Sequence, residues 1–140
     1  MSVYFESARP GYFAPTRFEA DLYDCEVEGK IPDDLNGTFY RIQPDRKYPQ
    51  RYVNDIPFNG DGMATYFRFS HGHVDFKSRY VQTDRYVAEA KARKALFGLY
   101  RNRYSDDPSV KDLSGGTANT NLFYHAGKLL ALKEDTSEFF

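Results

Sequence analysis

Large aliphatic residues are scarce in this chain, and aromatic residues supply much of its apolar material. Twelve Tyr and twelve Phe occur among the 140 residues, whereas Leu, Ile, Val and Phe together number only 31. This fraction lies just above the range typical of disordered chains. The length suffices for one domain with a single core. An aromatic-rich, hydrophilic composition nevertheless favours a piece of a larger sheet structure over an independent globule.

Apolar and polar side chains alternate over several short segments, which is the pattern of half-buried β-strands. Tyr23, Cys25 and Val27, for example, alternate with acidic residues. Alternation of this kind places every second side chain on one face of a sheet. The sequence predicts six strands, at residues 23–28, 38–42, 63–69, 74–83, 118–124 and 128–133.

The segments between these strands are rich in Pro, Gly, Asn and Asp, which favour turns and irregular backbone. Pro10, Gly11 and Pro15 interrupt the first twenty residues, so residues 1–20 are expected to form an extended arm. Tight turns are predicted at residues 59–62, 70–73 and 125–127, and longer loops at residues 43–57 and 102–116.

Residues 85–101 differ from the rest of the chain, because strong helix formers replace the alternation there. The acidic Glu89 lies early in this segment, and its basic residues from Lys91 to Arg101 lie late, as the helix dipole prefers. This segment predicts a helical insertion between strands. The expected fold class is mainly β with one helix.

The charge distribution argues against several classes of partner. Nineteen basic and twenty acidic residues are interspersed and give a net charge of -1, so no basic face for nucleic acid or an anionic membrane is expected. No apolar run approaches a membrane span, and the first residues lack a secretory signal pattern. The single Cys25 permits no internal disulfide, which favours the cytoplasm, and we interpret it as a small buried hydrophobe.

Two stretches resemble metal sites only superficially. The segment Asn59-Gly60-Asp61-Gly62 lacks the later carboxylates of a calcium loop, so a structural turn is the favoured interpretation. His71, His73 and Asp75 could form a metal triad, but they lie at a predicted hairpin turn, where exposed polar residues are expected. His125 lies in another predicted turn. We therefore predict no metal ligand within this chain.

Three stretches, in the same order as in the family, resemble the carotenoid cleavage oxygenases. The first is Asn-Gly-Thr-Phe-Tyr-Arg at residues 36–41. The second is Phe-Asn-Gly-Asp-Gly-Met at residues 58–63, followed by residues 78–83. The third is Ala-Asn-Thr-Asn at residues 118–121, leading to Gly-Lys-Leu-Leu-Ala-Leu-Lys-Glu at residues 127–134. The resemblance implies the N-terminal strands and blades of a seven-bladed β-propeller, with residues 1–140 as part of a single domain.

Two variants resemble one branch of that family, the bacterial lignostilbene dioxygenases. These are Gln43-Pro44-Asp45 with Lys47-Tyr48-Pro49, and residues 93–102. Enzymes of that branch use Fe(II) and O2 to cleave the central double bond of 4-hydroxystilbenes into two aromatic aldehydes. The resemblance therefore implies a small aromatic substrate and O2 as reactants.

The resemblance also implies roles for four side chains. Tyr100 and Lys133 match the residues that hold the phenolic oxygen of the substrate, and Phe58 matches an aromatic wall of the cleft. An ammonium at hydrogen-bond distance favours the phenolate, which pushes electron density toward the double bond. Glu134 matches a carboxylate that accepts a hydrogen bond from an iron-ligating histidine and so fixes its orientation.

The family's iron is held by four histidines, and His71, His73 and His125 match none of these positions. We expect the chain to stop before the first ligand, so that the Fe(II) ligands lie outside it and the 140 residues alone are inactive. A homodimer is compatible with the full-length form.

Two alternatives remain open at the level of the sequence. One keeps the family and changes the substrate to a carotenoid or apocarotenoid, although a hydrocarbon polyene offers nothing for Lys133 to bind. The other is a non-catalytic, β-rich binding module derived from such an enzyme.

Overall fold

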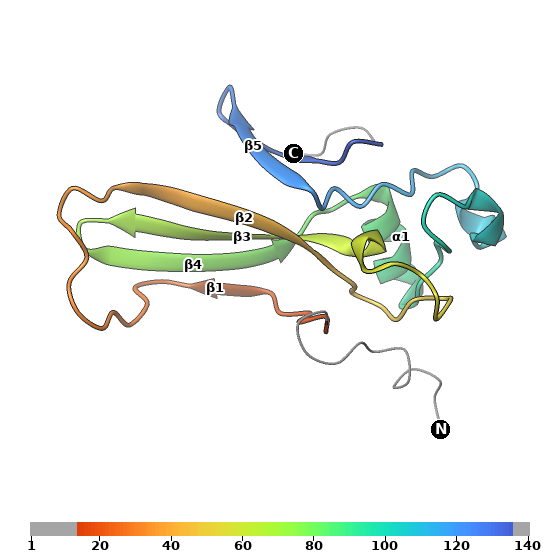
Figure 1. The fold of residues 1–140 in the computed structure, drawn as a ribbon, viewed down its shortest axis with the longest axis horizontal. Helices are drawn as coiled ribbons and strands as arrows, with labels where there is room; N and C mark the ends of the chain where they lie inside the picture. The colour runs from red at the N-terminus through yellow and green to blue at the C-terminus, as the bar shows by residue number, and fades with distance from the viewer. Residues whose placement is uncertain (1–13, 136–140) are drawn as a thin grey trace.

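The computed structural model describes residues 14–135, most of which belong to or flank a four-stranded antiparallel sheet (Figure 1). Three long strands, β2 (Gly37–Asp45), β3 (Asp61–Ser70) and β4 (His73–Tyr80), form its body. The short strand β1 (Ala20–Leu22) pairs with β4, which gives the order β1-β4-β3-β2.

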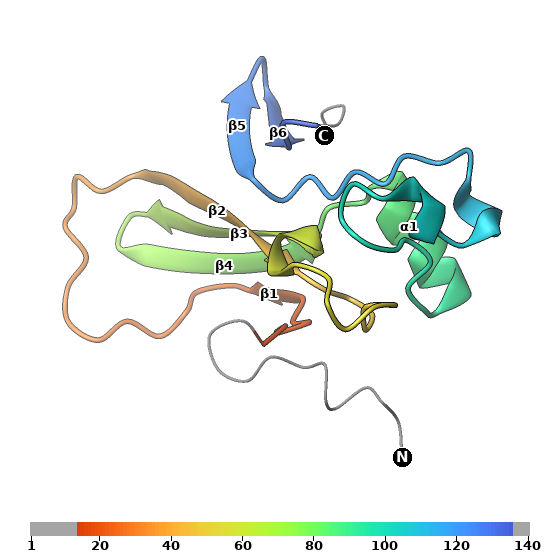
Figure 2. The same ribbon diagram turned by 45° about the vertical axis from the view of Figure 1, so that its right-hand side comes forward.

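A helix lies at one end of this sheet, and a second hairpin lies beside β2, as Figures 1 and 2 show from two directions. The helix α1 (Asp84–Ala92) follows β4, and β5 (Asn121–His125) pairs with β6 (Lys128–Leu132) in a separate hairpin. Three short 3-10 turns occupy the connections: η2 (Pro57–Asn59), η3 (Arg103–Ser105) and η4 (Pro108–Val110). A mainly β fold with one α-helix is thus confirmed for residues 14–135.

The hairpin of β3 and β4 confirms two predicted strands and the turn between them. Its connection is His71-Gly72, and both residues have positive φ angles, 51° and 80°. Such a turn matches the right-handed twist of the strands it joins. Phe67 and Phe76 face each other across the two strands with ring centroids 5.0 Å apart. Cross-strand aromatic pairs of this kind stabilise a sheet.

The strand predicted at residues 23–28 is wrong, because the first strand lies at Ala20–Leu22. Asp24 adopts a positive φ of 53°, which breaks the extended conformation. Its N–H donates to Asp75 Oδ1 at 2.8 Å, and the neighbouring N–H of Cys25 donates to the Val74 carbonyl at 2.7 Å. The predicted arm, residues 1–20, lies largely outside the described residues, and its last residue belongs to β1.

The loop predicted at residues 43–57 begins later than expected, because β2 continues through Gln43, Pro44 and Asp45. β2 lies at the edge of the sheet, where a proline with no N–H to donate is tolerated. The tight turn predicted at residues 59–62 is also wrong. Gly60 has an extended backbone and β3 already begins at Asp61.

The helix predicted at residues 85–101 ends at Ala92. Arg93 adopts the left-handed conformation, and its N–H donates to the carbonyls of Glu89 and Ala90. This left-handed cap satisfies carbonyls at the helix end. The Glu89 side chain then accepts the N–H groups of Leu96 and Phe97, so the chain turns back instead of continuing.

The helix begins at a side-chain cap, which supplies a stability prediction. Thr83 is almost fully buried, and its Oγ1 accepts the N–H of Tyr86 at 3.0 Å. Replacing it by alanine should lower the free energy of unfolding by about 1 kcal/mol. Thr83→Ser retains the acceptor and should recover most of the loss in urea-induced unfolding. Equal losses for both variants would mean that packing, and not the cap, sets the effect.

The second hairpin confirms the last predicted strands in position, with shifted ends. β5 starts at Asn121 and not at residue 118, because Ala118 has a positive φ of 45°. Ala126 and Gly127 form the predicted turn with φ angles of 49° and 80°.

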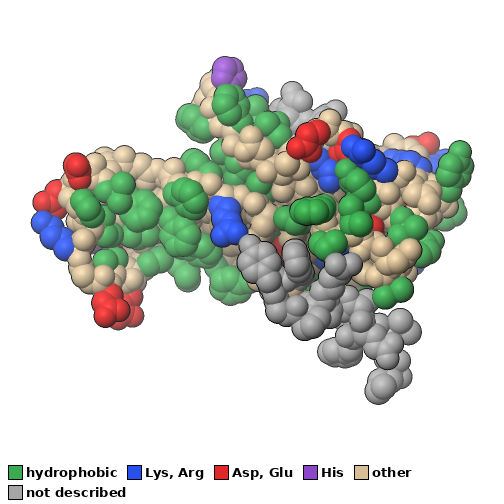
Figure 3. Space-filling view, viewed as in Figure 1, with side chains coloured by type: hydrophobic (Ala, Val, Ile, Leu, Met, Phe, Trp, Pro, Cys, Tyr) green, Lys and Arg blue, Asp and Glu red, His purple; other side chains and the backbone are tan. Residues whose placement is uncertain are grey.

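The buried apolar core is small and gathers around α1. One cluster contains Met63, Tyr80 and Tyr86, and another contains Leu96, Phe97 and Val110. Many large apolar side chains stay exposed, as the space-filling view of one face shows over the sheet (Figure 3). Phe39, for example, is 58% exposed. This agrees with the composition, which supplies little material for an independent core.

Candidate functional site

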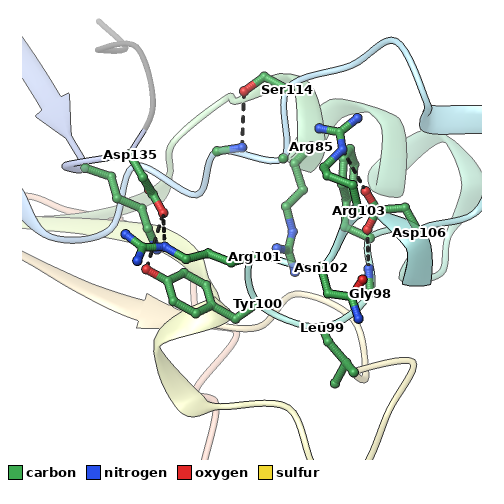
Figure 4. Close-up of a pocket in the computed structure, with 14 residues that line it drawn as sticks. Arg85, Gly98, Leu99, Tyr100, Arg101, Asn102, Arg103, Asp106, Ser114 and Asp135 are labelled. Carbon is green, nitrogen blue, oxygen red and sulfur yellow. Dashed lines mark hydrogen bonds and ion pairs between the residues drawn. The ribbon is translucent and has the colours of Figure 1, made fainter.

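A cavity of about 310 Å³ lies beside α1, between two segments that are distant in sequence (Figure 4). One wall is the loop of residues 97–103, and the opposite wall is formed by Lys133 and Asp135, which directly follow β6. Residues 114–116 with Arg85 and Asp106 complete the lining. The cavity is rich in charged side chains, and two of its cations, Arg101 and Lys133, lie over the ring of Tyr100.

Tyr100 and Lys133, predicted from the sequence as a pair, are brought together in this cavity. Lys133 Nζ lies 4.9 Å from the centroid of the Tyr100 ring, which is cation–π distance. The ammonium also donates to Thr117 Oγ1 at 3.1 Å and to the Phe58 carbonyl at 3.4 Å. Burial lowers the pKa of Lys133, and the nearby Asp135 opposes this shift.

Asp135 is a part of the cavity that the sequence reasoning missed. The Tyr100 hydroxyl donates to Asp135 Oδ2 at 3.3 Å, and Arg101 Nε donates to the same oxygen at 3.3 Å (Figure 4). A signal was present, because Asp135 stands two residues after Lys133. Since the hydroxyl proton points at Asp135, the lone pairs of the Tyr100 oxygen are available to a ligand.

Phe58 contributes to the site through its backbone. Its side chain is 65% exposed and does not line the cavity. Its carbonyl accepts from Lys133 Nζ and, at 2.7 Å, from Asn119 Nδ2. The role of Phe58 as an aromatic wall of the substrate cleft therefore stays a prediction, because its ring lies outside this cavity.

Glu134 is exposed, and its Oε2 accepts from Thr120 Oγ1 at 3.4 Å. The three histidines each contact a different neighbouring side chain. His73 Nδ1 lies 2.6 Å from Asp24 Oδ1, His71 Nδ1 lies 2.9 Å from the hydroxyl of Ser70, and His125 stacks on Phe123. Within residues 14–135 no group of three or more His, Cys, Asp or Glu side chains could hold a metal ion.

A buried polar network lies behind the cavity, and the sequence reasoning did not anticipate it. Arg85 and Glu89 from α1 meet Asp61 from β3, and each of the three is at most 4% exposed. Arg85 Nε lies 3.8 Å from a carboxylate oxygen of each of the other two. Burial raises the pKa of Asp61 and of Glu89, while the Arg85 guanidinium opposes both shifts.

Asp55 and Asn59 extend this network from the segment around η2. Asn59 accepts from Arg85 Nη1 at 2.8 Å and donates to Asp55 Oδ2 at 2.8 Å and to the Gly98 carbonyl at 2.9 Å. The network thus joins α1, the segment around η2 and the loop that carries Tyr100.

No helix within residues 14–135 is long and apolar enough to cross a membrane.

The described residues thus combine an open antiparallel sheet with a charged cavity that Tyr100 and Lys133 both line. The comparisons identify the family. The model of the family described as retinal pigment epithelial membrane protein (RPE65) matches residues 13–138, and the chain belongs to this family. The resemblance to carotenoid cleavage oxygenases is thereby confirmed.

Individual relatives support the same assignment. Lignostilbene-alpha,beta-dioxygenase isozyme III of Sphingomonas paucimobilis is 53% identical over 130 residues, which cover 93% of this chain and 26% of that protein. Isoeugenol monooxygenase of Pseudomonas nitroreducens is 56% identical over 126 residues, which cover 89% of this chain and 26% of that protein.

Among solved structures, the crystal structure of Pseudomonas brassicacearum lignostilbene dioxygenase superimposes with a TM-score of 0.84 and 45% identity, covering 89% of this chain and 26% of that one. The chain thus spans about a quarter of the length of the relatives it matches.

Proposed function

We propose that this chain is part of a non-haem Fe(II) dioxygenase that cleaves the central double bond of 4-hydroxystilbenes with O2 and yields two aromatic aldehydes. The observation that carries the proposal is the convergence of Lys133 and Tyr100 on one cavity. The names of two relatives support it, because lignostilbene and isoeugenol are both phenols with a conjugated carbon–carbon double bond.

The chemistry follows from the contacts of these two side chains. An unperturbed phenol has a pKa of about 10 and is therefore mostly neutral at pH 7. The Lys133 ammonium donates a hydrogen bond to the phenolic oxygen and stabilises its anionic form. The Tyr100 oxygen accepts a hydrogen bond from the phenol hydroxyl while its own hydroxyl donates to Asp135 Oδ2. Ionisation of the phenol releases its proton to water, and the Lys133 ammonium balances the resulting charge. A substrate oxygen with anionic character pushes electron density through the conjugated system into the double bond.

Phe58 and Glu134 complete the proposal with their predicted roles. The exposed Phe58 ring is an aromatic wall for a flat stilbene, and Glu134 accepts a hydrogen bond from an iron-ligating histidine. Within residues 14–135 no three His, Cys, Asp or Glu side chains are grouped so that they could hold an iron ion, so we assign the Fe(II) ligands to the remainder of the full-length protein. By full-length protein we mean the polypeptide that carries these residues and the part that its relatives add.

The full-length protein is proposed to be a seven-bladed propeller in the cytoplasm, compatible with a homodimer. Residues 1–140 form part of its single domain, and the exposed apolar face of the sheet is consistent with further strands packing there.

A cleavage assay tests this function. The full-length protein, loaded with Fe(II) in air, should convert 4-hydroxystilbene to two aldehydes and leave β-carotene intact, because the hydrocarbon has no oxygen for Lys133. The 140-residue chain, supplied with Fe(II) and O2, should give no product. Cleavage of the carotenoid in preference to the stilbene would favour the alternative substrate, and turnover by the short chain would contradict the assignment of the iron ligands.

A further inference from the structure

The backbone that leads to Tyr100 is held by side chains and not by regular secondary structure. Five consecutive N–H groups, from Leu96 to Tyr100, each donate to a side-chain oxygen at 2.8 to 3.0 Å. The acceptors are Glu89 Oε1 for Leu96 and Phe97, Asp106 Oδ1 for Gly98, Ser105 Oγ for Leu99 and Asp55 Oδ1 for Tyr100. Carboxylate acceptors make stronger hydrogen bonds than neutral ones, so this segment is fixed firmly.

Asp55 is the member of this set that touches Tyr100 itself. Its carboxylate is 4% exposed and accepts three hydrogen bonds. Oδ1 accepts the Tyr100 N–H at 3.0 Å, while Oδ2 accepts Arg46 Nη2 at 2.9 Å and Asn59 Nδ2 at 2.8 Å. Because donors occupy both oxygens, the carboxylate cannot turn without losing a bond, and the position of the Tyr100 main chain is tied to it.

Residues 55–59, the short segment that begins with Asp55, also position Lys133. The Phe58 carbonyl, three residues after Asp55, accepts the Lys133 ammonium and the Asn119 amide. Asn59 ties this segment to the loop that carries Tyr100, because its amide donates both to Asp55 and to the Gly98 carbonyl. Residues 55–59 therefore hold the main chain of Tyr100 and the side chain of Lys133 in one frame, although 33 positions separate these two residues in the sequence.

We propose that Asp55 is a positioning residue that sets the distance between the Tyr100 hydroxyl and the Lys133 ammonium, and so the selectivity for substrates with a 4-hydroxyl group. Asp55 does not line the cavity and acts only through the Tyr100 main chain and Asn59. This inference rests on the proposed function, because it assigns a purpose to the phenol-binding pair.

The test is Asp55→Asn in the Fe(II)-loaded full-length protein. An amide has the size of the carboxylate, but its NH2 group must face either the Tyr100 N–H or the Arg46 and Asn59 donors. For 4-hydroxystilbene, kcat/KM should fall about tenfold, mainly through KM, as expected for one lost hydrogen bond to a buried charge. The Ki of trans-stilbene, a competitor without an oxygen, should change less than twofold.

Asp45→Asn is the matched control. The Asp45 carboxylate is equally buried and accepts from Thr16, Arg17 and the Tyr80 hydroxyl, but it touches no residue of the cavity. Asp45→Asn should alter stability without altering the ratio of kcat/KM for 4-hydroxystilbene to the Ki of trans-stilbene. Ser105→Ala, which removes the acceptor of the Leu99 N–H and the donor to the Asn102 carbonyl, is a milder second variant and should lower kcat/KM for 4-hydroxystilbene two- to threefold.

Three outcomes overturn the positioning role: no change in either constant for Asp55→Asn, an equal change in both, or the same selective change in Asp45→Asn. If Asp55→Asn does not fold, an unchanged kcat/KM in Ser105→Ala overturns it instead. Lys133→Ala tests the proposed phenol-binding function separately from the positioning role of Asp55. If Lys133→Ala lowers turnover while Asp55→Asn does not, only the positioning role fails; if Lys133→Ala has no effect, the phenol-binding site itself is wrong.

Discussion

Replacing Lys133 by alanine in the full-length protein should lower kcat/KM for 4-hydroxystilbenes by about 100-fold, the upper range for losing a hydrogen bond to a charged group. Lys133 Nζ is half-buried between Thr117 Oγ1, the Phe58 carbonyl and the Tyr100 ring. These partners hold the ammonium in place and leave it a donor for a phenolic oxygen, since an ammonium has three donors. Steady-state kinetics with 4-hydroxystilbene measures the loss.

Two further variants show what is lost. Lys133→Met keeps the apolar stem and should be as defective as Lys133→Ala, whereas Lys133→Arg keeps the charge and should retain more activity. Lys30→Ala is the control for a lost surface charge, because Lys30 is exposed and pairs with the exposed Asp33. Unchanged turnover in Lys133→Ala would remove the phenol-binding role and leave the carotenoid alternative.

Replacing Gly62 by alanine should lower the free energy of unfolding by about 3 kcal/mol or more, at the severe end of overpacking. A Cβ at this position would lie 2.3 Å from the Ala118 carbonyl oxygen and 2.8 Å from that of Thr117. Both obstacles are backbone atoms, and both residues are almost fully buried, so neither can yield by changing a rotamer. The Gly62 N–H also donates to the Thr117 carbonyl at 2.8 Å.

Gly37→Ala is the matched control, because a Cβ there meets nothing within 4 Å and the position also lies in a strand. Urea-induced unfolding of the two variants should separate them clearly. Since Thr117 also holds the Lys133 ammonium, Gly62→Ala should disturb the cavity as well as the fold. Equal stability of the two variants would mean that residues 117–118 can move away from β3.

Local patterns in the sequence were sufficient for the strands whose partner follows at once. The β3–β4 and β5–β6 hairpins were predicted in place, because alternation and a two-residue turn act over a few neighbouring residues. The helix was predicted to exist but nine residues too long, up to residue 101 where the structure ends it at Ala92. Residues 96–100 read Leu-Phe-Gly-Leu-Tyr, and the glycine among them disfavours a helix. Their N–H groups instead donate to the side chains of Glu89, Asp106, Ser105 and Asp55.

For the candidate site, too, short motifs indicated some residues and missed others. The family motifs selected Tyr100 and Lys133, and the structure brings these two side chains together. Asp55 and the buried pairs of Arg85 were not selected, because no local pattern distinguishes them from surface charges. Only burial shows that these charges have partners.

The sequence by itself determined the family, the mainly β character and the two tight hairpin turns, and it selected Tyr100 and Lys133. Each of these depends on short motifs or on the period of neighbouring side chains. The tertiary structure alone decided where β1 lies, where α1 ends and how Tyr100 is held. These features depend on hydrogen bonds between residues far apart in the chain, such as that from the Tyr100 N–H to Asp55 across 45 positions. A buried N–H must find an acceptor, and which acceptor is near is settled only when the whole chain is packed.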